Sequence, residues 1–290
     1  MGSKIISMGE QRDFYNIKKE GFLSERQRSV EEAVSHLEKR FTEARPGLRQ
    51  LAERLNEPFR TGAYDAIVGE DKAGRLPTLF VKHFAERVSD EAEQESPQVF
   101  FVAGGRHLSV PEQRDTLQKY IETLKPRIQR RALLVSEHVA GGASLSHLAE
   151  SFERAGIPFD IAAVSLQHPE EAYRTGDPQA RLAGLSASAS YGGRKISKEE
   201  AWSGATIPEN VKIFSGDSSA GDSKEAHGLA FHTAQEASGV WTTPATGEAT
   251  TMRNWWARPE VVSVAREKMK QMADEIYDEL NPKEETSKAA

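Results

Sequence analysis

Apolar positions along the chain follow two different periods, and the change between them marks a change of element type. Between residues 24 and 56, apolar side chains recur every three or four positions, which predicts amphipathic helix with Ser24 as its N-cap. From Tyr64 onward, short apolar runs alternate with amphipathic segments. The runs predict five strands, at Ala66–Gly69, Val99–Ala103, Leu133–Val135, Ile161–Leu166 and Val211–Ser215.

The amphipathic segments between these runs predict helices. Strands that alternate with helices are typical of a parallel sheet with helices on its faces, so we expect an α/β fold. A further helix is expected from Pro259 onward, where apolar residues form one stripe and proline suits the first turn. The helices between strands are expected at Pro77–Ser89, Pro111–Leu124 and Leu145–Ala155.

The remaining segments suggest how the chain is organised. Residues 169–210 and 216–258 are rich in Gly, Ser, Thr and Ala without a clear period, so we expect long functional loops or disorder there. The expected division is a helical N-terminal extension (1–60), an α/β domain with loop-rich hood segments (61–258), and a C-terminal helix with a tail (259–290).

The amino-acid composition argues against several classes of function. The 290-residue chain has a formal net charge of −6, which argues against a general affinity for nucleic acid. It contains no cysteine, so a disulfide framework, a thiol nucleophile and a thiolate metal site are excluded. The histidines lack zinc-ligand spacing, so no metal site on the protein is expected. We expect a cytoplasmic protein without a membrane partner, whose first three residues fit an expression remnant.

The segment 132–156 combines an apolar strand, an acid and a loop of small residues that leads into a helix. Backbone N–H groups of such a loop converge on an anion, and the helix adds the positive end of its dipole. The acid, Glu137, lies at the carboxyl end of the strand, where open α/β sheets bind ligands. This pattern predicts a phosphate site formed by Ala140, Gly141, Gly142, Ala143 and Ser144.

A second loop of this kind follows the first predicted strand. Residues 69–75 mix glycines with two basic side chains, Lys72 and Arg75, and the backbone of Ala73 and Gly74 lies between them. Arg75-Leu76 stands where a nucleotide-hydrolysing P-loop requires Lys-Ser/Thr, so that class is rejected. Two anion-binding loops at neighbouring strand ends suit one ligand that carries both a pyrophosphate and a single phosphate.

The order of these parts resembles type I phosphoribosyltransferases. Residues 64–88 are similar to the strand, pyrophosphate loop and helix of that family, and Leu133–Ser144 is similar to its phosphoribosyl-pyrophosphate motif. The resemblance implies transfer of a phosphoribosyl group with release of pyrophosphate, and Mg²⁺ bound mainly through the pyrophosphate. It also implies that Lys72 and Arg75 serve the leaving group and Glu137 the ribose hydroxyls. Arg106, in the loop after the second strand, is a further candidate.

The chain departs from the family motif at informative positions. Ser136 stands in place of the first acid, Ala140 in place of a catalytic acid, and Gly141 in place of a threonine. Ser144 keeps the second hydroxyl. These departures leave two functions open: a phosphoribosyltransferase, or a non-catalytic sensor of nucleotides or phosphoribosyl pyrophosphate on the same fold. A third possibility is an assembly role, and a homodimer is also left open.

Each candidate residue also has an interpretation without a ligand. Gly141-Gly142 fits a tight turn between strand and helix. Lys72, Arg75 and Arg106 fit solvated loop charges, and Glu137 fits an ion pair with a neighbouring cation. The sequence alone does not identify the acceptor of the phosphoribosyl group.

Overall fold

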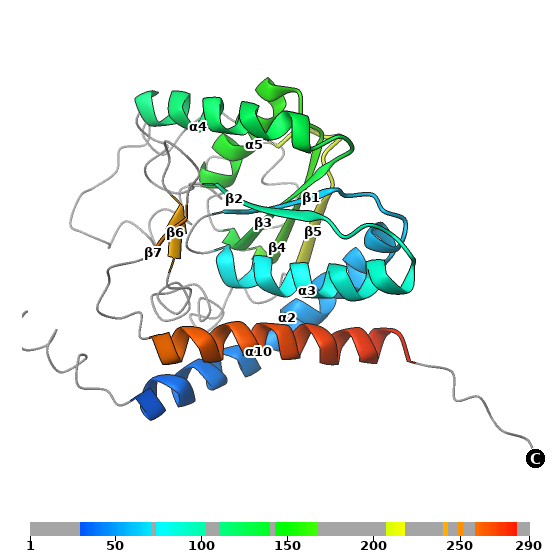
Figure 1. Ribbon diagram of the computed structural model, residues 1–290, viewed down its shortest axis with the longest axis vertical. Coiled ribbons are helices and arrows are strands. Elements are labelled where there is room, and N and C mark those ends of the chain that lie inside the picture. Colours follow the sequence, from blue (N-terminus) through cyan, green and yellow to red (C-terminus); the bar gives the residue numbers. More distant parts are fainter. Residues whose placement is uncertain are drawn as a thin grey trace, which may run out of the picture.

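A five-stranded, all-parallel sheet forms the centre of the molecule, in the strand order β2-β1-β3-β4-β5 (Figure 1). The structure is a computed structural model that describes residues 30–70, 74–102, 111–139, 143–166, 207–217, 240–242, 249–251 and 259–282. The strands are β1 (Ala66–Glu70), β2 (Gln98–Val102), β3 (Ala132–Val139), β4 (Phe159–Leu166) and β5 (Ile213–Asp217).

Helices cover both faces of this sheet (Figure 1). One face carries α2 (Val30–Arg60), α3 (Arg75–Glu91) and α10 (Pro259–Leu280), and the other carries α4 (Pro111–Leu124) and α5 (Ala143–Ala155). A short 3-10 helix, η2 (Lys125–Arg127), extends α4. The expected α/β class with a parallel sheet between helices is therefore confirmed.

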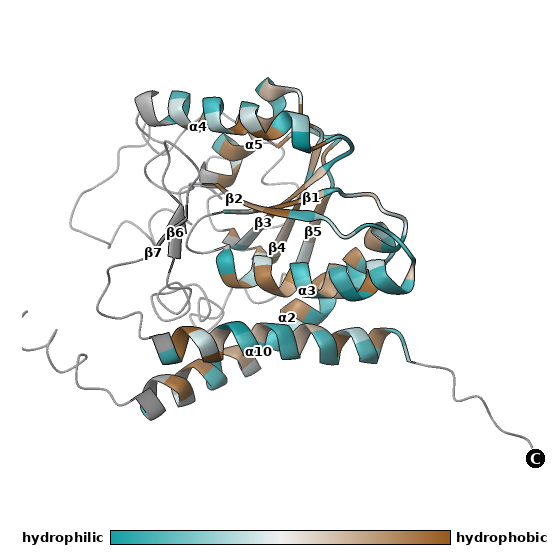
Figure 2. Cartoon of the chain, viewed as in Figure 1, coloured by the Kyte–Doolittle hydropathy of each residue, from teal (hydrophilic) through white to brown (hydrophobic). Residues whose placement is uncertain are grey.

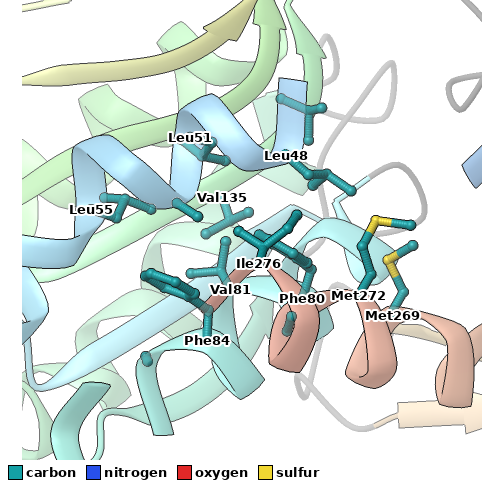
Figure 3. Packing of buried hydrophobic residues seen from close by; sticks show 14 of the residues in the cluster. Leu48, Leu51, Leu55, Phe80, Val81, Phe84, Val135, Met269, Met272 and Ile276 are labelled. Atoms are coloured by element: carbon teal, nitrogen blue, oxygen red, sulfur yellow. The ribbon is translucent and has the colours of Figure 1, made fainter. Parts of the chain in front are cut away.

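Two hydrophobic cores hold these layers together, one on each face of the sheet. The strands are mostly apolar, whereas the helices are apolar only on the side that meets the sheet or another helix (Figure 2). In the first core, α10 lies against α2 and α3, and the side chains of all three helices meet below β3 (Figure 3). The labelled members of this core are Leu48, Leu51, Leu55, Phe80, Val81, Phe84, Val135, Met269, Met272 and Ile276.

Close backbone contact fixes α2 on the edge of the sheet. A Cβ added to Gly216 of β5 would lie 2.2 Å from the carbonyl oxygen of Val164 and 2.4 Å from that of Gly47 in α2. Only a residue without a side chain leaves room for this approach. Ion pairs hold the outer layer as well: Arg87 of α3 contacts Asp274 and Asp278 of α10 at 3.0 and 2.8 Å.

A buried polar network connects neighbouring segments at the amino-terminal edge of the sheet. The Tyr64 hydroxyl donates to Asp160 at 2.8 Å, and Arg131 donates to the other oxygen of Asp160 at 2.9 Å. The backbone N–H of Lys212 donates to Asp160 at 2.8 Å. Burial and the charge of Asp160 raise the pKa of Tyr64, which keeps the hydroxyl protonated as a donor. Both carboxyl oxygens of Asp160 thus accept hydrogen bonds. Asp160 lies at the edge of the sheet away from the predicted loops.

Several predicted bounds need correction. The strand predicted to end at Val135 continues to Val139, because pairing with β4 extends that far. The helix predicted from Leu145 begins at Ala143, so Ala143 and Ser144 lie in its first turn and not in a loop. The segment 216–258 contains two paired strands, β6 (Val240–Thr242) and β7 (Ala249–Thr251), too short to show a period.

None of the helices in the described part of the chain is both long and apolar enough to cross a membrane.

Candidate functional site

The strand order makes β1 and β3 neighbours, so their carboxyl ends lie at the same edge of the sheet. These two strands are neighbours, but the chain leaves β1 for α3 on one face and leaves β3 for α5 on the other. Where connections diverge in this way, the ends of two adjacent strands form the usual ligand site of an open parallel sheet. The two segments predicted to bind anions therefore leave neighbouring strands at the same edge of the sheet.

Ser136 and Glu70 form a buried pair across these two strands. The register aligns Gly69 of β1 with Val135 of β3, so the next residue of each strand is also adjacent. The Ser136 hydroxyl donates to Oε2 of Glu70 at 2.8 Å, and the two residues are 2% and 8% exposed. Ser136 was expected at the site from the sequence, whereas Glu70 was not, because a cross-strand pairing leaves no signal in the local sequence.

Glu137 lies on the opposite face of the sheet from this pair. Leu133 and Val135, at alternate positions of β3, belong to the core beneath α2, α3 and α10, and Glu137 continues that alternation. Its side chain is 3% exposed, and neither carboxyl oxygen has a hydrogen-bond partner in the described structure. Burial therefore raises the pKa of Glu137 well above its ordinary value.

The structure corrects the expected position of Glu137. It gives no support to the alternative that Glu137 forms an ion pair with a neighbouring cation. Glu137 does not follow the strand but lies within it, because β3 continues through two more residues to Val139. No ion pair joins Glu137 to a cation among the described residues. A buried carboxyl without a partner is uncommon in folded proteins, and such groups concentrate at functional sites. The Thr78 hydroxyl, also buried over this face, likewise has no partner in the described part.

Gly74 and Arg75 lie at the start of α3, beside the backbone of β1 and β3. The Gly74 N–H donates to the carbonyl oxygen of Glu70 at 2.9 Å, and an added Cβ would lie 2.5 Å from that oxygen and 2.6 Å from the carbonyl oxygen of Val135. Glycine at this position lets the first turn of α3 contact both strands. The backbone of α3 therefore begins next to the ends of β1 and β3.

Arg75 is buried, at 5% exposure, and its guanidinium lies 4.2 Å from the centre of the Phe101 ring. The ring attracts the cation, but the amino terminus of a helix repels it because the helix dipole is positive there. Phe101 lies on β2, and no sequence motif had indicated it.

The described residues include only part of the predicted site. Ala143 and Ser144 are placed as helical backbone in the first turn of α5. The register further sets His138 beside Ser165, and Ser165 beside Asp217, along the same edge of the sheet. No cluster of three metal-ligating residues occurs within the described segments. Lys72, Ala73, Arg106, Ala140, Gly141 and Gly142 lie outside the described residues.

Comparison with known proteins gives no relative: no family model, no curated protein and no solved structure matches the chain.

Proposed function

We propose that the chain is a phosphoribosyltransferase-like protein that binds phosphoribosyl pyrophosphate or a nucleoside 5′-phosphate. The observation that carries the proposal is the arrangement at the switch point of the sheet. The segments after β1 and β3 leave neighbouring strands at the same edge of the sheet, with a buried arginine at one helix and, within β3, a buried acid that has no hydrogen-bond partner in the described structure. A ligand with phosphate at both ends and hydroxyls between them matches this distribution of charge.

Each part of the site has a role in this proposal. The backbone of 140–144, which runs into the first turn of α5 at Ala143, binds the 5′-phosphate. Lys72 and Arg75 neutralise the pyrophosphate, and Glu137 accepts hydrogen bonds from ribose hydroxyls. Mg²⁺ prefers oxygen ligands and usually binds through one or two carboxylates plus substrate phosphates, so the carboxyl of Glu137 suits it, and the bound ion would neutralise the leaving group.

The reaction is a displacement at the anomeric carbon of the ribose. The bond from this carbon to pyrophosphate breaks, the pyrophosphate leaves with the electron pair, and a nucleophile on the acceptor forms the new bond. Positive charge develops on the sugar in the transition state. The carboxylate of Glu137, once ionised, would stabilise that charge, and the basic residues of the first loop would stabilise the leaving group.

A second candidate function is a sensor that binds the same ligand without turnover. The replacement of the first motif acid by Ser136, whose hydroxyl is already bonded to Glu70, favours this alternative. The protein then binds the ligand without transforming it.

Two measurements test the proposal in sequence. Calorimetry with phosphoribosyl pyrophosphate, ribose 5-phosphate and inorganic phosphate, with and without Mg²⁺, should show the tightest binding for phosphoribosyl pyrophosphate. Release of pyrophosphate in the presence of mixed nucleobase and amine acceptors would then indicate an enzyme, and binding without release would indicate a sensor. Failure of all three ligands to bind at millimolar concentration would refute both functions.

A further inference from the structure

Phe101 of β2 places its aromatic ring beside the backbone of the neighbouring strand. The register aligns Phe101 with Gly69 of β1, and a Cβ added to Gly69 would lie 2.8 Å from Cδ1 and Cε1 of the ring. Glycine at this position therefore leaves the space that the ring occupies. The ring lies on the face of the sheet that α3 covers, because Val99, two residues earlier on β2, packs against the first core.

The same ring supports the guanidinium of Arg75, the first residue of α3. The guanidinium carbon lies over the ring, 4.2 Å from its centre, and Arg75 is 5% exposed. The attraction between a cation and the face of a ring is stronger at a buried site than at an exposed one. An aromatic ring carries no net charge, so this contact holds the guanidinium in place without cancelling its positive charge.

We infer that Phe101 is a positioning residue for Arg75, and that through it the protein prefers pyrophosphate to a single phosphate. An arginine side chain loses much rotamer freedom when it binds an anion. A guanidinium that is already held in place has lost that freedom beforehand, so binding costs less. The inference rests on the proposed function, in which Arg75 neutralises the pyrophosphate, and extends it to a residue of β2.

Two variants of Phe101, measured with and without Arg75, test this inference. Phe101→Leu removes the ring and Phe101→Tyr keeps it, and both should fold because Phe101 is only half-buried. Calorimetry measures the ratio of the dissociation constants for inorganic phosphate and inorganic pyrophosphate. Phe101→Leu should lower this ratio about threefold to tenfold, whereas Phe101→Tyr should keep the wild-type ratio. In an Arg75→Met background, Phe101→Leu should change the ratio no further, because its effect passes through Arg75.

Phe100→Leu provides the matched control, because Phe100 precedes Phe101 on the same strand and makes a contact of the same kind. The guanidinium carbon of Arg127 lies 4.5 Å from the centre of the Phe100 ring. Arg127 belongs to η2, at the amino-terminal edge of the sheet, and Phe100 packs in the second core. Phe100→Leu should therefore lower the melting temperature without changing the ratio.

The outcomes distinguish failure of this inference from failure of the proposed function. If the wild type binds pyrophosphate no more tightly than phosphate, the separate pyrophosphate loop is refuted, and the role of Phe101 with it. If Arg75→Met lowers the ratio and Phe101→Leu does not, the proposed function stands and the role of Phe101 is wrong. The inference is likewise overturned if Phe101→Tyr loses the preference, if Phe100→Leu lowers the ratio as much as Phe101→Leu does, or if Phe101→Leu has the same effect without Arg75.

Discussion

Replacement of Glu137 by methionine is expected to make the protein more stable, although it changes a buried residue. Both carboxyl oxygens of Glu137 are out of contact with solvent and have no partner in the described structure. Methionine is unbranched, fits the same space, and has no strong hydrogen-bonding group. The substitution therefore removes an unsatisfied polar group from the boundary of the first core.

The size of the effect follows from the cost of such a group. An unsatisfied buried polar group costs about 1–3 kcal/mol, and each kcal/mol shifts the melting temperature of a domain this large by about 2–4 °C. Glu137→Met should thus raise the melting temperature by about 2–12 °C. Binding of ribose 5-phosphate should weaken at the same time, which is the usual trade between stability and function at a site of this kind.

The contribution of Glu137 to the stability of the wild type changes with pH in one direction. Burial raises the pKa of Glu137 in the folded state, whereas the unfolded chain ionises at the ordinary carboxyl pKa. Between these two values the folded protein holds a proton that the unfolded chain has lost. Wild-type stability therefore falls as the pH rises through this interval, and the contribution of Glu137 changes no further above the raised pKa. The methionine variant lacks this contribution.

Urea denaturation of both proteins at about pH 4 and about pH 8 measures the difference. The advantage of the variant should be larger at the higher pH. A variant that is less stable than the wild type at both pH values would refute the reasoning, because it would mean that Glu137 has a favourable structural partner.

Three further predictions concern other parts of the structure. Gly74→Ala places a Cβ 2.5 Å from the Glu70 carbonyl oxygen, and should cost about 1–3 kcal/mol in urea denaturation; wild-type stability would show that α3 can move aside. Tyr64→Phe removes the bond to Asp160, and should lower the melting temperature by about 2–8 °C with no change in ligand binding. Arg75→Met should weaken pyrophosphate binding about tenfold more than phosphate binding in calorimetry, and equal losses would count against a separate pyrophosphate loop.

The sheet could be predicted from the sequence because its strands are short apolar runs. The runs at 66–69 and 161–166 lie within β1 and β4, and the helix at Pro111–Leu124 has the predicted bounds. Polar residues at strand ends were harder to place. Ser136 and Glu137 interrupt the apolar run, so the strand was predicted to stop before them, whereas pairing with β4 carries it to Val139.

The contacts of the candidate site depend on pairing between distant segments. Glu70 meets Ser136 only because β1 and β3 are aligned in one register, and the two residues are 66 positions apart. Whether Glu137 has a partner depends on the helices that pack on its face of β3, which are α2, α3 and α10. No local pattern of residues contains this information, although the order of the strands and loops did indicate that the two predicted anion-binding segments follow neighbouring strands.

The place of α10 in the first core also has a consequence for synthesis of the protein. Arg87 of α3 and Asp278 of α10 are 191 positions apart, yet they form one ion pair, and α10 covers apolar side chains of both α2 and α3. During translation, the sheet and its second core can form while α10 is still unmade. The apolar side chains of α2 and α3 that α10 covers then stay exposed to water until residues 259–280 have been synthesised, and exposed apolar surface of this kind makes a growing chain prone to aggregate during that interval.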